Sequence, residues 1–497
     1  MAVYELLLKT LTPLHIGDGE VLRRDFDFAV QGRKTYRMNV DAVLEAKEAK
    51  WSAAQGDYPL PGKMLDAPDY QNAALFRYSL RGAPRSERTD AELRSFIKDS
   101  NDRPYIPGSS IKGALRTALA WHGWSEVKPE LNRNTIGRSR GWAGQGLERK
   151  LFGRDPNHDL LRALHVSDCI GPQQSGEGLI LVNAQVLTKK SAGSPVELEA
   201  LQAEAQFRGT VTIDETLFAP WAERELGFGN RRRWLTEMMA RAHAHSHARM
   251  EQLAEWFERA DDAETVAGFY RSLLNARVGE NRAVMQIGWG AGWDGKTFWT
   301  HLQEDVRLFE QLVSDFRMHK AGKGSPARKA GDPFPRSKRV AMVVKEGVAK
   351  PAAPLGWVLV ELKPVGKLPA EWAETTRAIE RAASATIVEP MLAKPTSPPL
   401  SGPLPPPRAA PTPKPPLTPT FTDLPKVGDR FKGEVFHVEG RTLELFIPGL
   451  DDTVAYAHIA PEDNDTSKKY AEGDTVFCEV ISLAQQGKVW EVRCRRG

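Results

Sequence analysis

The sequence predicts an α+β body followed by a separate all-β domain. Strand-like and helix-like segments alternate over residues 1–388, which favours a mixed core. Residues 389–425 hold 14 of the 35 prolines, so they can form neither a helix nor a central strand. Residues 426–497 contain short β-like runs divided by glycines. We therefore expect a body (1–388), an extended Pro-rich tether (389–425) and a small all-β domain (426–497).

Composition restricts the class of protein. With 41% hydrophobic and 27% charged residues, the chain is not wholly disordered. No run of 18 apolar residues and no secretory signal is evident, so we expect a cytoplasmic protein without a membrane partner. Three cysteines are too few for a disulfide framework or a thiolate zinc site. The net charge of +4 is too small to identify a nucleic-acid binder, although residues 421–497 carry 10 basic against 14 acidic residues.

The elements of the body follow from hydrophobic periodicity. Alternating residues predict strands, and apolar residues three and four apart predict helices. The strands are expected at residues 3–10, 26–30, 179–188 and 204–213, and the helices at 111–121, 234–259 and 263–276. Two basic stretches, 131–146 and 319–339, read as irregular segments that are either solvated loops or become ordered around an anion.

Five strands are expected in the tail, at residues 430–438, 442–447, 453–458, 474–483 and 488–493. Five short strands, with the longest connection after the third, are typical of an OB-like barrel. Its spacing also matches an S1-type RNA-binding barrel, in which Phe436, Phe446, Tyr456 and His458 would contact RNA. The acidic balance of this domain argues against RNA and makes a protein-docking barrel nearly as good an interpretation.

Three glycine-centred segments of the body are candidates for ligand binding. The first, Thr12–Gly19, contains His15 and Gly17 directly after the first strand, where a tight turn or a close backbone approach to a ligand is expected. The second, Pro104–Leu119, places Ser109 and Ser110 at the start of a helix. Free amides there, with Lys112 and Arg116 on one helical face, would suit a phosphate, although an ordinary capped helix explains the pattern too.

The third segment, Gln286–Thr297, combines Gly288, Gly290 and Gly292 with Lys296 and two tryptophans. It fits neither a Walker A motif nor a dinucleotide fingerprint, which disfavours nucleotide hydrolysis. Glycines allow close backbone approach, and aromatic faces allow bases to stack, so the segment suits a polynucleotide. Arg231, Arg232 and Arg233 form a further candidate phosphate contact, because cations at a helix start oppose the helix dipole.

Taken in order, these motifs resemble the RAMP superfamily of type III CRISPR effector proteins. The resemblance rests on His15–Gly19, Ile106–Ala118, the run Leu164–Asp168, the strand Phe207–Ile213 and the late glycine-rich loop, and it spans residues 3–363. Within the superfamily the chain is most similar to the fifth subunit of Csm complexes, which caps the end of the guide-RNA filament. The resemblance implies a modified ferredoxin-like, RRM-related core with insertions. It also implies guide-RNA contacts at Gly288–Gly295 and Ser109–Arg116, while the tether and barrel lie outside the usual pattern.

We expect no catalysis, metal or cofactor. The filament-forming RAMP subunit cuts target RNA with an aspartate after its first strand, but here Asp25 and Asp27 lie in a strand-like alternation. A guide-processing RAMP enzyme would use His15, for which no acid–base partner is evident. His243 and His247 have zincin spacing without the glutamate or a third ligand, so His243, His245 and His247 are interpreted as a polar helix face.

The sequence therefore predicts a non-catalytic subunit that binds guide RNA (crRNA) on the 3′ side of a type III CRISPR complex. Its expected partners are guide RNA, target RNA and other subunits of the complex, chiefly the backbone RAMP subunit. Two alternatives remain: a RAMP endoribonuclease that acts through Asp25, Asp27 or His15, and an RNA-binding adaptor whose barrel recruits a host ribonuclease.

Overall fold

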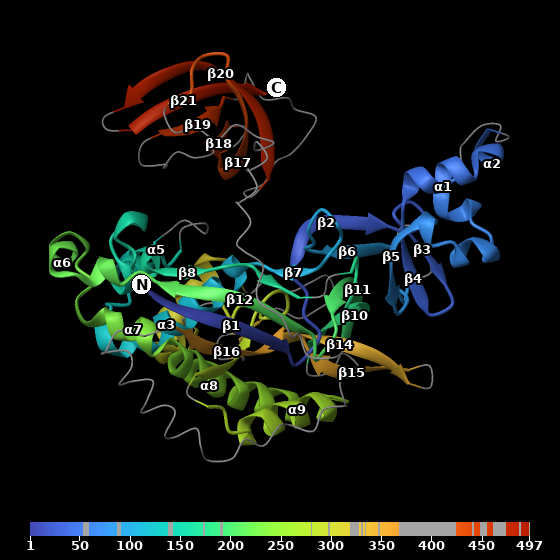
Figure 1. Ribbon diagram of the computed structural model, residues 1–497. Coiled ribbons are helices and arrows are strands. Elements are labelled where there is room, and N and C mark those ends of the chain that lie inside the picture. Colours follow the sequence, from blue (N-terminus) through green and yellow to red (C-terminus); the bar gives the residue numbers. More distant parts are fainter. Residues whose placement is uncertain are drawn as a thin grey trace. The chain divides into compact units, whose positions relative to one another are not determined.

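A computed structural model gives the chain two compact units, Met1–Ser401 and Gly402–Gly497 (Figure 1). The structure describes residues 1–52, 59–86, 91–137, 143–171, 174–188, 192–279, 281–296, 299–318, 328–329, 332, 334–345, 348–366, 424–439, 442–447, 455–460, 474–486 and 489–496. The predicted tether falls almost entirely outside these residues. The expectation of a mixed α+β body and an all-β C-terminal region is confirmed.

The first sheet of the body is built around the N-terminal strand. β1 pairs antiparallel with β12, from Ala2 opposite Ile213, and with β16 on its other side. Its strand order is β13-β16-β1-β12-β9-β7, with β8 also paired to β12. The strands are β1 (Ala2–Thr10), β7 (Tyr105–Ile106), β8 (Leu164–Val166), β9 (Cys169–Ile170), β12 (Gln206–Ile213), β13 (Arg282–Gln286) and β16 (Trp357–Val365).

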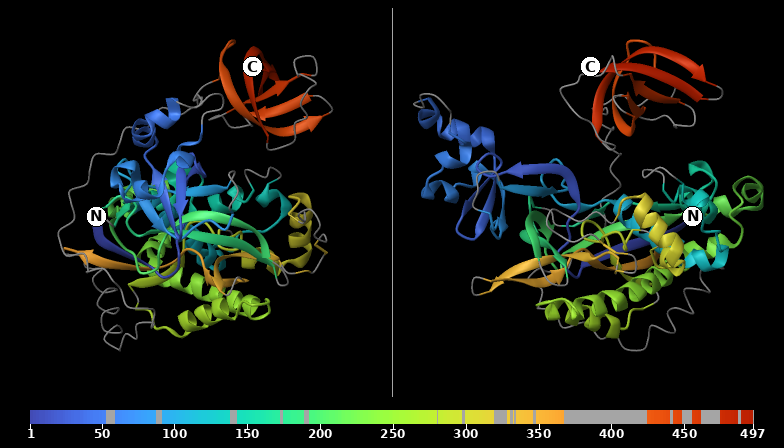
Figure 2. Two further views of the ribbon diagram at one scale, coloured as in Figure 1. Left: turned by 90° about the vertical axis from the view of Figure 1, so that its right-hand side faces the viewer. Right: turned by 180° about the vertical axis from the view of Figure 1, so that it is seen from behind.

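The second sheet begins where the chain leaves the first, because β2 follows β1 after a short loop. Its order is β2-β6-β11-β10-β5-β4-β3, with β14 paired to β10 and β15 paired to β14. The strands β3 and β4, with helices α1 and α2, lie in a lobe that projects from the body (Figures 1 and 2). The bounds are β2 (Gly17–Arg23), β3 (Phe28–Gln31), β4 (Lys34–Met38), β5 (Phe76–Arg81), β6 (Glu92–Phe96), β10 (Leu179–Thr188), β11 (Ala192–Leu201), β14 (Ser337–Lys345) and β15 (Val348–Pro354).

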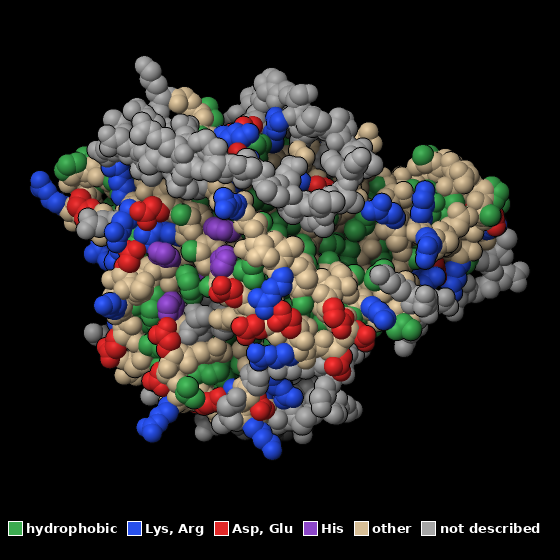
Figure 3. All heavy atoms as spheres, turned by 90° about the horizontal axis from the view of Figure 1, so that it is seen from below, with side chains coloured by type: hydrophobic (Ala, Val, Ile, Leu, Met, Phe, Trp, Pro, Cys, Tyr) green, Lys and Arg blue, Asp and Glu red, His purple; other side chains and the backbone are tan. Residues whose placement is uncertain are grey.

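Helices cover the first sheet, and α3 packs against α8 beneath it (Figure 1). The main core joins Leu6 and Leu8 of β1 to Ile111 and Leu115 of α3. On the side that α8 and α9 cover, basic side chains are interspersed with acidic ones (Figure 3). The helices are α1 (Val40–Ala46), α2 (Glu48–Ser52), α3 (Gly108–Val127), α4 (Arg133–Ile136), α5 (Gln145–Phe152), α6 (Pro220–Leu226), α7 (Arg232–Thr236), α8 (Met238–Glu258), α9 (Glu264–Asn275), α10 (Trp299–Glu304) and α11 (Val306–Asp315).

Short 3₁₀ helices connect several of these elements. They lie at Pro61–Met64, Ala67–Gln71, Ala73–Leu75, Pro156–His158, Leu160–Ala163, Glu215–Phe218 and Gly229–Arg231. Within the described ranges, the helices are all too short or too polar to cross a lipid bilayer.

The second unit is a closed barrel of five strands in the order β17-β18-β19-β21-β20. Only β19 and β21 run parallel. The strands are β17 (Arg430–Glu439), β18 (Thr442–Phe446), β19 (Ala455–Ile459), β20 (Thr475–Gln486) and β21 (Val489–Arg496). The inward positions are apolar, with Phe431, Leu445 and Val492 fully buried. All five predicted strands are therefore present, and their ends differ by a few residues.

Two expected elements of the body are wrong in detail. The strand predicted at 26–30 begins at Phe28, because Asp25, Phe26 and Asp27 form a turn in which Asp25 has a φ of 63°. The alternation of polar and aromatic residues that suggested a strand lies in this turn. In the turn, the Asp27 amide donates a hydrogen bond to the Arg23 carbonyl at 2.8 Å. The helix predicted at 234–259 is two helices, α7 and α8, that meet at Glu237.

Both basic stretches contain ordered parts that pair with acids of the chain itself. In 131–146, α4 carries Arg133, which pairs with Asp315 at 2.7 Å. In 319–339, Arg328 pairs with Glu310 at 2.7 Å, and strand β14 begins at Ser337. Residues 138–142 and most of 319–333 lie outside the described residues. Arg133 and Arg328 are thus paired with carboxylates of the chain itself.

Two glycines of α3 provide a test of the packing between α3 and the α7–α8 segment. An alanine Cβ at Gly123 would lie 2.1 Å from the buried Trp234 ring, whereas a Cβ at Gly113 meets no atom within 4 Å. We expect Gly123→Ala to destabilise the body by about 1–3 kcal/mol through overpacking. Gly113→Ala should leave the melting temperature unchanged or raise it, since alanine favours a helix by about 1 kcal/mol over glycine. Thermal unfolding of the two variants measures this, and equal stability of Gly123→Ala and wild type would contradict the packing.

Candidate nucleic-acid interface

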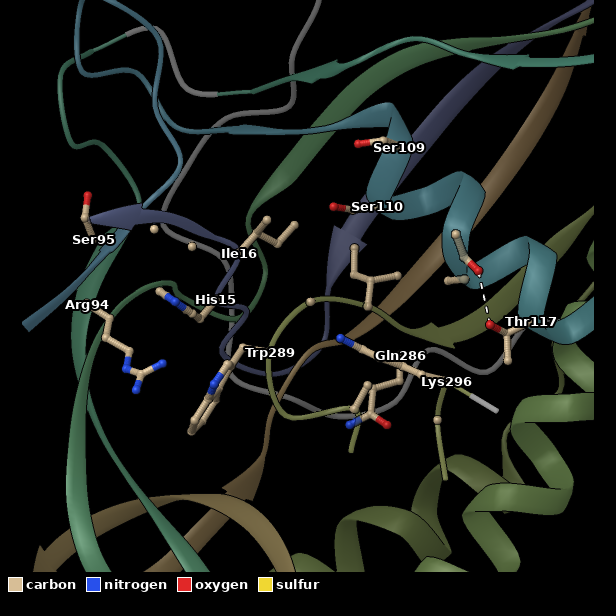
Figure 4. A pocket seen from close by; sticks show the side chains of 18 of the residues that line it. His15, Ile16, Arg94, Ser95, Ser109, Ser110, Thr117, Gln286, Trp289 and Lys296 are labelled. Atoms are coloured by element: carbon tan, nitrogen blue, oxygen red, sulfur yellow. Dashed lines mark hydrogen bonds between the residues drawn. The ribbon is translucent and has the colours of Figure 1, made fainter. Parts of the chain in front are cut away.

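The three glycine-centred segments meet in one cleft of about 640 Å³ (Figure 4). Residues 15–17 and 19–21, with Arg94 and Ser95, form one side, and the first turns of α3 face them across the opening. The loop after β13 forms the floor between these two sides. The lining residues are His15, Ile16, Gly17, Gly19, Glu20, Val21, Arg94, Ser95, Ser109, Ser110, Gly113, Ala114, Thr117, Gln286, Ile287, Gly288, Trp289, Ala291, Gly295 and Lys296.

Backbone hydrogen bonds hold the loops of the cleft together. The Trp289 amide donates to the His15 carbonyl at 2.8 Å. The Gly356 amide donates to the Pro13 carbonyl at 2.8 Å, and its own carbonyl accepts from the Ile287 amide at 2.8 Å. Residues more than 270 positions apart are thus fixed next to one another, which makes the floor and one wall of the cleft a single rigid element.

His15 is a structural residue of this wall. Its side chain is buried, and its Nδ1 lies 2.6 Å from the Glu199 carbonyl oxygen, to which it donates. Burial lowers the pKa of His15, so the ring is neutral near pH 7. Beneath it, the buried Glu199 carboxylate accepts from Lys98 Nζ at 2.6 Å and from the Tyr78 hydroxyl at 2.8 Å. The ring therefore contributes shape and orientation to the cleft.

The late loop needs its glycines for the fold itself. Gly288, Gly290 and Gly292 have φ values of 72°, 105° and 72°, in the region that favours glycine, which confirms the predicted positive φ. A Cβ at Gly288 would lie 2.4 Å from the His15 carbonyl oxygen. The close approach at Gly288 is thus to the protein's own backbone. Gly288 lines the cleft, whereas Gly290 and Gly292 lie on the opposite side of the loop, along a second cavity.

Two cations of the cleft have no acidic partner among the described residues. Arg94, on β6, and Lys296 are both exposed, and neither makes an ion pair or side-chain hydrogen bond with another described residue. Figure 4 shows that Arg94 lies beside Trp289 and that Lys296 reaches into the opening. Arg339 places its guanidinium 4.8 Å from the centre of the Trp289 ring. Cations held next to an aromatic ring suit an RNA strand.

Sequence reasoning missed Arg94 and Ser95, and it gave Gln286 and Arg339 no role of their own although both lie in segments that it singled out. Arg94 belongs to β6, a strand that the periodicity did not reveal, and its place follows from pairing with β2 at Val21. The expectation that both tryptophans offer a free ring also needs correction. Arg339 covers one face of Trp289, and the Trp293 ring packs on Phe334 at 4.9 Å.

The start of α3 differs from its prediction. The helix begins at Gly108, three residues early, with Pro107 as its N-cap. The Gly108 amide is not free, because it donates to the Asp168 carboxylate at 2.8 Å. A carboxylate of the chain thus already lies at the positive end of the helix dipole. Ser109 and Ser110 still face the cleft, as Figure 4 shows.

Lys112 and Arg116 do not line the cleft. Arg116 pairs with Glu148 at 2.9 Å and with Asp159 at 2.8 Å, and its guanidinium lies 4.2 Å from the centre of the Phe152 ring. Lys112 donates to the Leu164 carbonyl at 2.7 Å, and burial lowers its pKa. The two cations fix α3 to its neighbours, and the predicted phosphate site between them is separated from the cleft.

The three arginines at residues 231–233 also have internal partners. Arg231 donates to the Lys150 carbonyl at 3.3 Å, and Arg232 lies 3.7 Å from Glu215. Arg233 pairs with Glu126 at 2.8 Å. None of the three lines the cleft. Carboxylates of the chain thus already lie beside Arg232 and Arg233, and a phosphate contact at residues 231–233 stays a prediction.

The candidate catalytic groups are dispersed. Asp25 lies in the turn before β3, where its carbonyl accepts from the Gly62 amide at 2.7 Å. Asp27 accepts from the Arg23 amide at 2.8 Å and pairs with Arg37 at 3.3 Å. Neither aspartate lines the cleft that contains His15.

The three histidines of α8 do not form one polar face. His245 is buried against Trp121, at 5.4 Å between ring centres, and burial lowers its pKa to about 3. His243 and His247 lie on another side, with ring centres 6.2 Å apart. Across the described part of the chain, no three His, Cys, Asp or Glu side chains are arranged to hold a metal ion.

The ion pairs of Arg116 with Glu148 and Asp159 predict that this residue stabilises the fold. Arg116→Ala leaves two partly buried carboxylates unpaired, so we expect it to lower the free energy of unfolding by about 1–2 kcal/mol. Arg149, on α5, is exposed and has no described partner, so Arg149→Ala should change stability little. Denaturant unfolding measures stability, and RNA titration across salt concentrations measures phosphate contacts. Unchanged stability with a flatter salt dependence in Arg116→Ala would restore the phosphate assignment.

Comparison with known proteins agrees with this architecture. The family model of the RAMP superfamily matches residues 7–293. The curated protein "CRISPR system Cms protein Csm5" of Mycobacterium tuberculosis is 26% identical over 354 residues, which cover 62% of this chain and 86% of the relative. Its counterpart in Streptococcus thermophilus is 27% identical over 248 residues, 43% of this chain and 65% of the relative.

A solved structure shows a similar fold. It is a chain in a cryo-EM structure of a Csm–crRNA–target RNA ternary complex of a type III-A CRISPR-Cas system, with a TM-score of 0.53 and 21% identity. The match covers 72% of this chain and 100% of that chain. The predicted resemblance is thus confirmed. Because the family model spans more than half of the sequence, the chain belongs to the RAMP superfamily and is similar to Csm5 proteins.

Proposed function

We propose that the protein is a non-catalytic RNA-binding subunit of a type III CRISPR effector complex. It would bind guide RNA on the 3′-end side of the complex and end the row of backbone RAMP subunits. The observation that carries this proposal is the cleft in which Arg94 and Lys296 have no acidic partner among the described residues. The names of its Csm5 relatives supply the type of complex.

The contrast between cations inside and outside the cleft supports an RNA ligand. The arginines that sequence reasoning favoured, Arg116 and Arg233, are both paired with carboxylates. Arg94 and Lys296 face the opening instead, and Ser109 and Ser110 add hydroxyl groups on the opposite side. This combination fits a phosphodiester backbone, which needs cations and hydrogen-bond donors without a fixed base sequence.

We also propose a ferredoxin-like core for the body and an OB-like fold for the barrel. In the first sheet, the central order β16-β1-β12-β8, with α3 after β1 and α8 after β12, matches the order of a ferredoxin-like βαββαβ core. In the second unit, the order β17-β18-β19-β21-β20 supports an OB-like barrel. RRM domains bind single-stranded RNA on their sheets, which agrees with an RNA-binding body.

A binding role fits the cleft better than a nuclease role. Its lining acids and bases are His15 and Glu20, together with the cations Arg94 and Lys296. The His15 Nδ1 is engaged by the Glu199 carbonyl, and the buried ring is held neutral. The aspartates proposed for cleavage lie elsewhere, so the described lining of the cleft offers no matched acid–base pair for RNA hydrolysis.

The barrel is proposed as a docking module for another protein, with a ribonuclease as one candidate. Its acidic balance favours a protein over RNA. Of the residues expected to bind RNA, the side chains of Phe436, Phe446 and Tyr456 lie outside those that the structure describes. His458 is half-buried on β19.

The cleft assignment predicts a specific salt dependence. For single-stranded nucleic acid, the logarithm of affinity falls with log salt by about 0.7 for each neutralised phosphate. Arg94→Ala with Lys296→Ala should therefore weaken binding of guide-length RNA and reduce that slope by about 1.4. Fluorescence anisotropy across salt concentrations measures both quantities.

A matched control removes the same charge elsewhere. Arg277 and Arg307 are exposed, do not line the cleft and have no described partner. Arg277→Ala with Arg307→Ala should leave the slope close to that of wild type. Equal slopes for the two double variants would reject the cleft as the RNA site.

The separation of the chain into two units predicts that the body binds RNA without the barrel. A chain that ends at residue 388 should remain soluble and retain the RNA affinity of the full chain, because all cleft residues precede residue 297. Gel filtration and RNA titration of the shortened chain check this. Aggregation, or a large loss of affinity, would show that the barrel contributes to the body or to the RNA site.

A further inference from the structure

A second cavity, of about 200 Å³, lies under the glycine loop. Gln286 and Ala291 line both this cavity and the RNA cleft, so the two spaces are neighbours on opposite sides of the loop. Its walls come from the loop itself, from α8 and α9, and from β10 and the start of β14. Gly290 and Gly292 of the third glycine-centred segment line this cavity, as do Lys338 and Arg339 of the basic stretch 319–339.

The main charged group of this cavity is a buried arginine. Arg249 of α8 is only 4% exposed. Its Nη2 donates to the Gln286 side-chain oxygen at 2.8 Å and to the Ala291 carbonyl at 3.3 Å, and both acceptors are neutral. Its Nε is buried and has no hydrogen-bond partner in the described structure. A buried guanidinium with neutral partners is unfavourable unless an anion completes its surroundings.

Other charges of the cavity leave an excess of positive charge. Lys338 pairs with Asp294, and both side chains are largely buried. Arg339 is exposed and connects the cavity to Trp289 in the cleft. Three cations thus line the cavity together with one carboxylate. Burial lowers the pKa of Arg249 and of Lys338, and the negative charge of Asp294 opposes this decrease at both groups.

We propose that this cavity binds a phosphate group between Arg249 and Lys338. Its volume exceeds that of several water molecules, at about 30 Å³ each, and so admits a phosphate. The phosphate could come from two sources: free inorganic phosphate, or the terminal phosphomonoester of an RNA whose chain lies in the cleft. The second source rests on the function proposed above. A guanidinium and an ammonium are the two side-chain groups that proteins use most for phosphate.

The first experiment titrates inorganic phosphate into the full chain and follows heat by calorimetry. We expect saturable binding to wild type, and binding about tenfold weaker in Lys338→Gln, which loses one charge-assisted contact. Asp294→Asn should bind phosphate several-fold more tightly, because the isosteric change removes the one carboxylate among the described residues that line the cavity and releases Lys338. Misfolding would weaken phosphate binding and could not tighten it. Tighter binding by Asp294→Asn therefore tests the proposal even if Lys338→Gln fails to fold.

The control is Lys350→Gln on the neighbouring strand β15. Lys350 is half exposed, lies 3.8 Å from Asp262 and does not line the cavity. Phosphate binding to this variant should equal that of wild type. Equal phosphate binding in Lys338→Gln, Asp294→Asn and Lys350→Gln, or no saturable binding to wild type, would overturn the proposal.

The second experiment identifies the source of the phosphate. RNA oligonucleotides of one sequence are compared with a 3′-phosphate, a 5′-phosphate or hydroxyl groups at both ends. A preference for one phosphorylated end that Lys338→Gln abolishes, and with which inorganic phosphate competes, assigns the site to an RNA terminus. Phosphate binding without any end preference assigns it to the free ion. If phosphate binds as expected but no RNA does, the cavity stands and the proposed RNA-binding function fails.

Discussion

The hydrogen bond from the Trp289 amide to the His15 carbonyl, 2.8 Å long, is the contact on which the candidate site depends. It joins the loop after β1 to the loop after β13, and these loops form one wall and the floor of the cleft. Gly288 must be a glycine because this contact brings the two backbones together. Without this hydrogen bond, the loop that separates the cleft from the second cavity would not be held in place.

Trp357 extends the same connection into the core. Its carbonyl accepts from the amides of Leu11 and Thr12, and its own amide donates to the Thr12 hydroxyl at 2.9 Å. Its indole donates to the Tyr270 hydroxyl at 3.1 Å, and the buried Arg249 guanidinium lies beside its ring. Strand β16 therefore links the loops of the site to helices α8 and α9. The site is rigid because its loops are anchored in the same core as the sheet.

The pairing of charges separates structural from functional cations. Arg116, Arg233 and Arg328 are tied to carboxylates and stabilise contacts between elements. Arg94 and Lys296 have no such partners among the described residues and face the same opening. An unpaired cation keeps its full attraction for an external anion, whereas a paired one must first break its internal contact. This distinction depends on which acids are near in space, so a count of charges along the sequence does not reveal it.

The sequence by itself determined the classes of structure and the ligand-binding segments. Periodicity located β1, β10, β12 and the five barrel strands, because alternation and turn glycines are local signals. The order of motifs indicated the RAMP superfamily, and the three glycine-centred segments do meet at one cleft.

Only the tertiary structure decided which side chains of those segments face a ligand. Arg116 and Lys112 satisfied every local rule for a phosphate site, yet Glu148, Asp159 and the Leu164 carbonyl meet them first. No sequence motif marked Arg94 as a binding residue, because its position in the cleft follows from the pairing of strands β6 and β2. The cavity around Arg249 likewise brings together residues from five separate segments. Local sequence patterns determine the secondary structure of a segment. The ion-pair and hydrogen-bond partners of a charged side chain come from segments distant in the sequence, so a local pattern does not contain them.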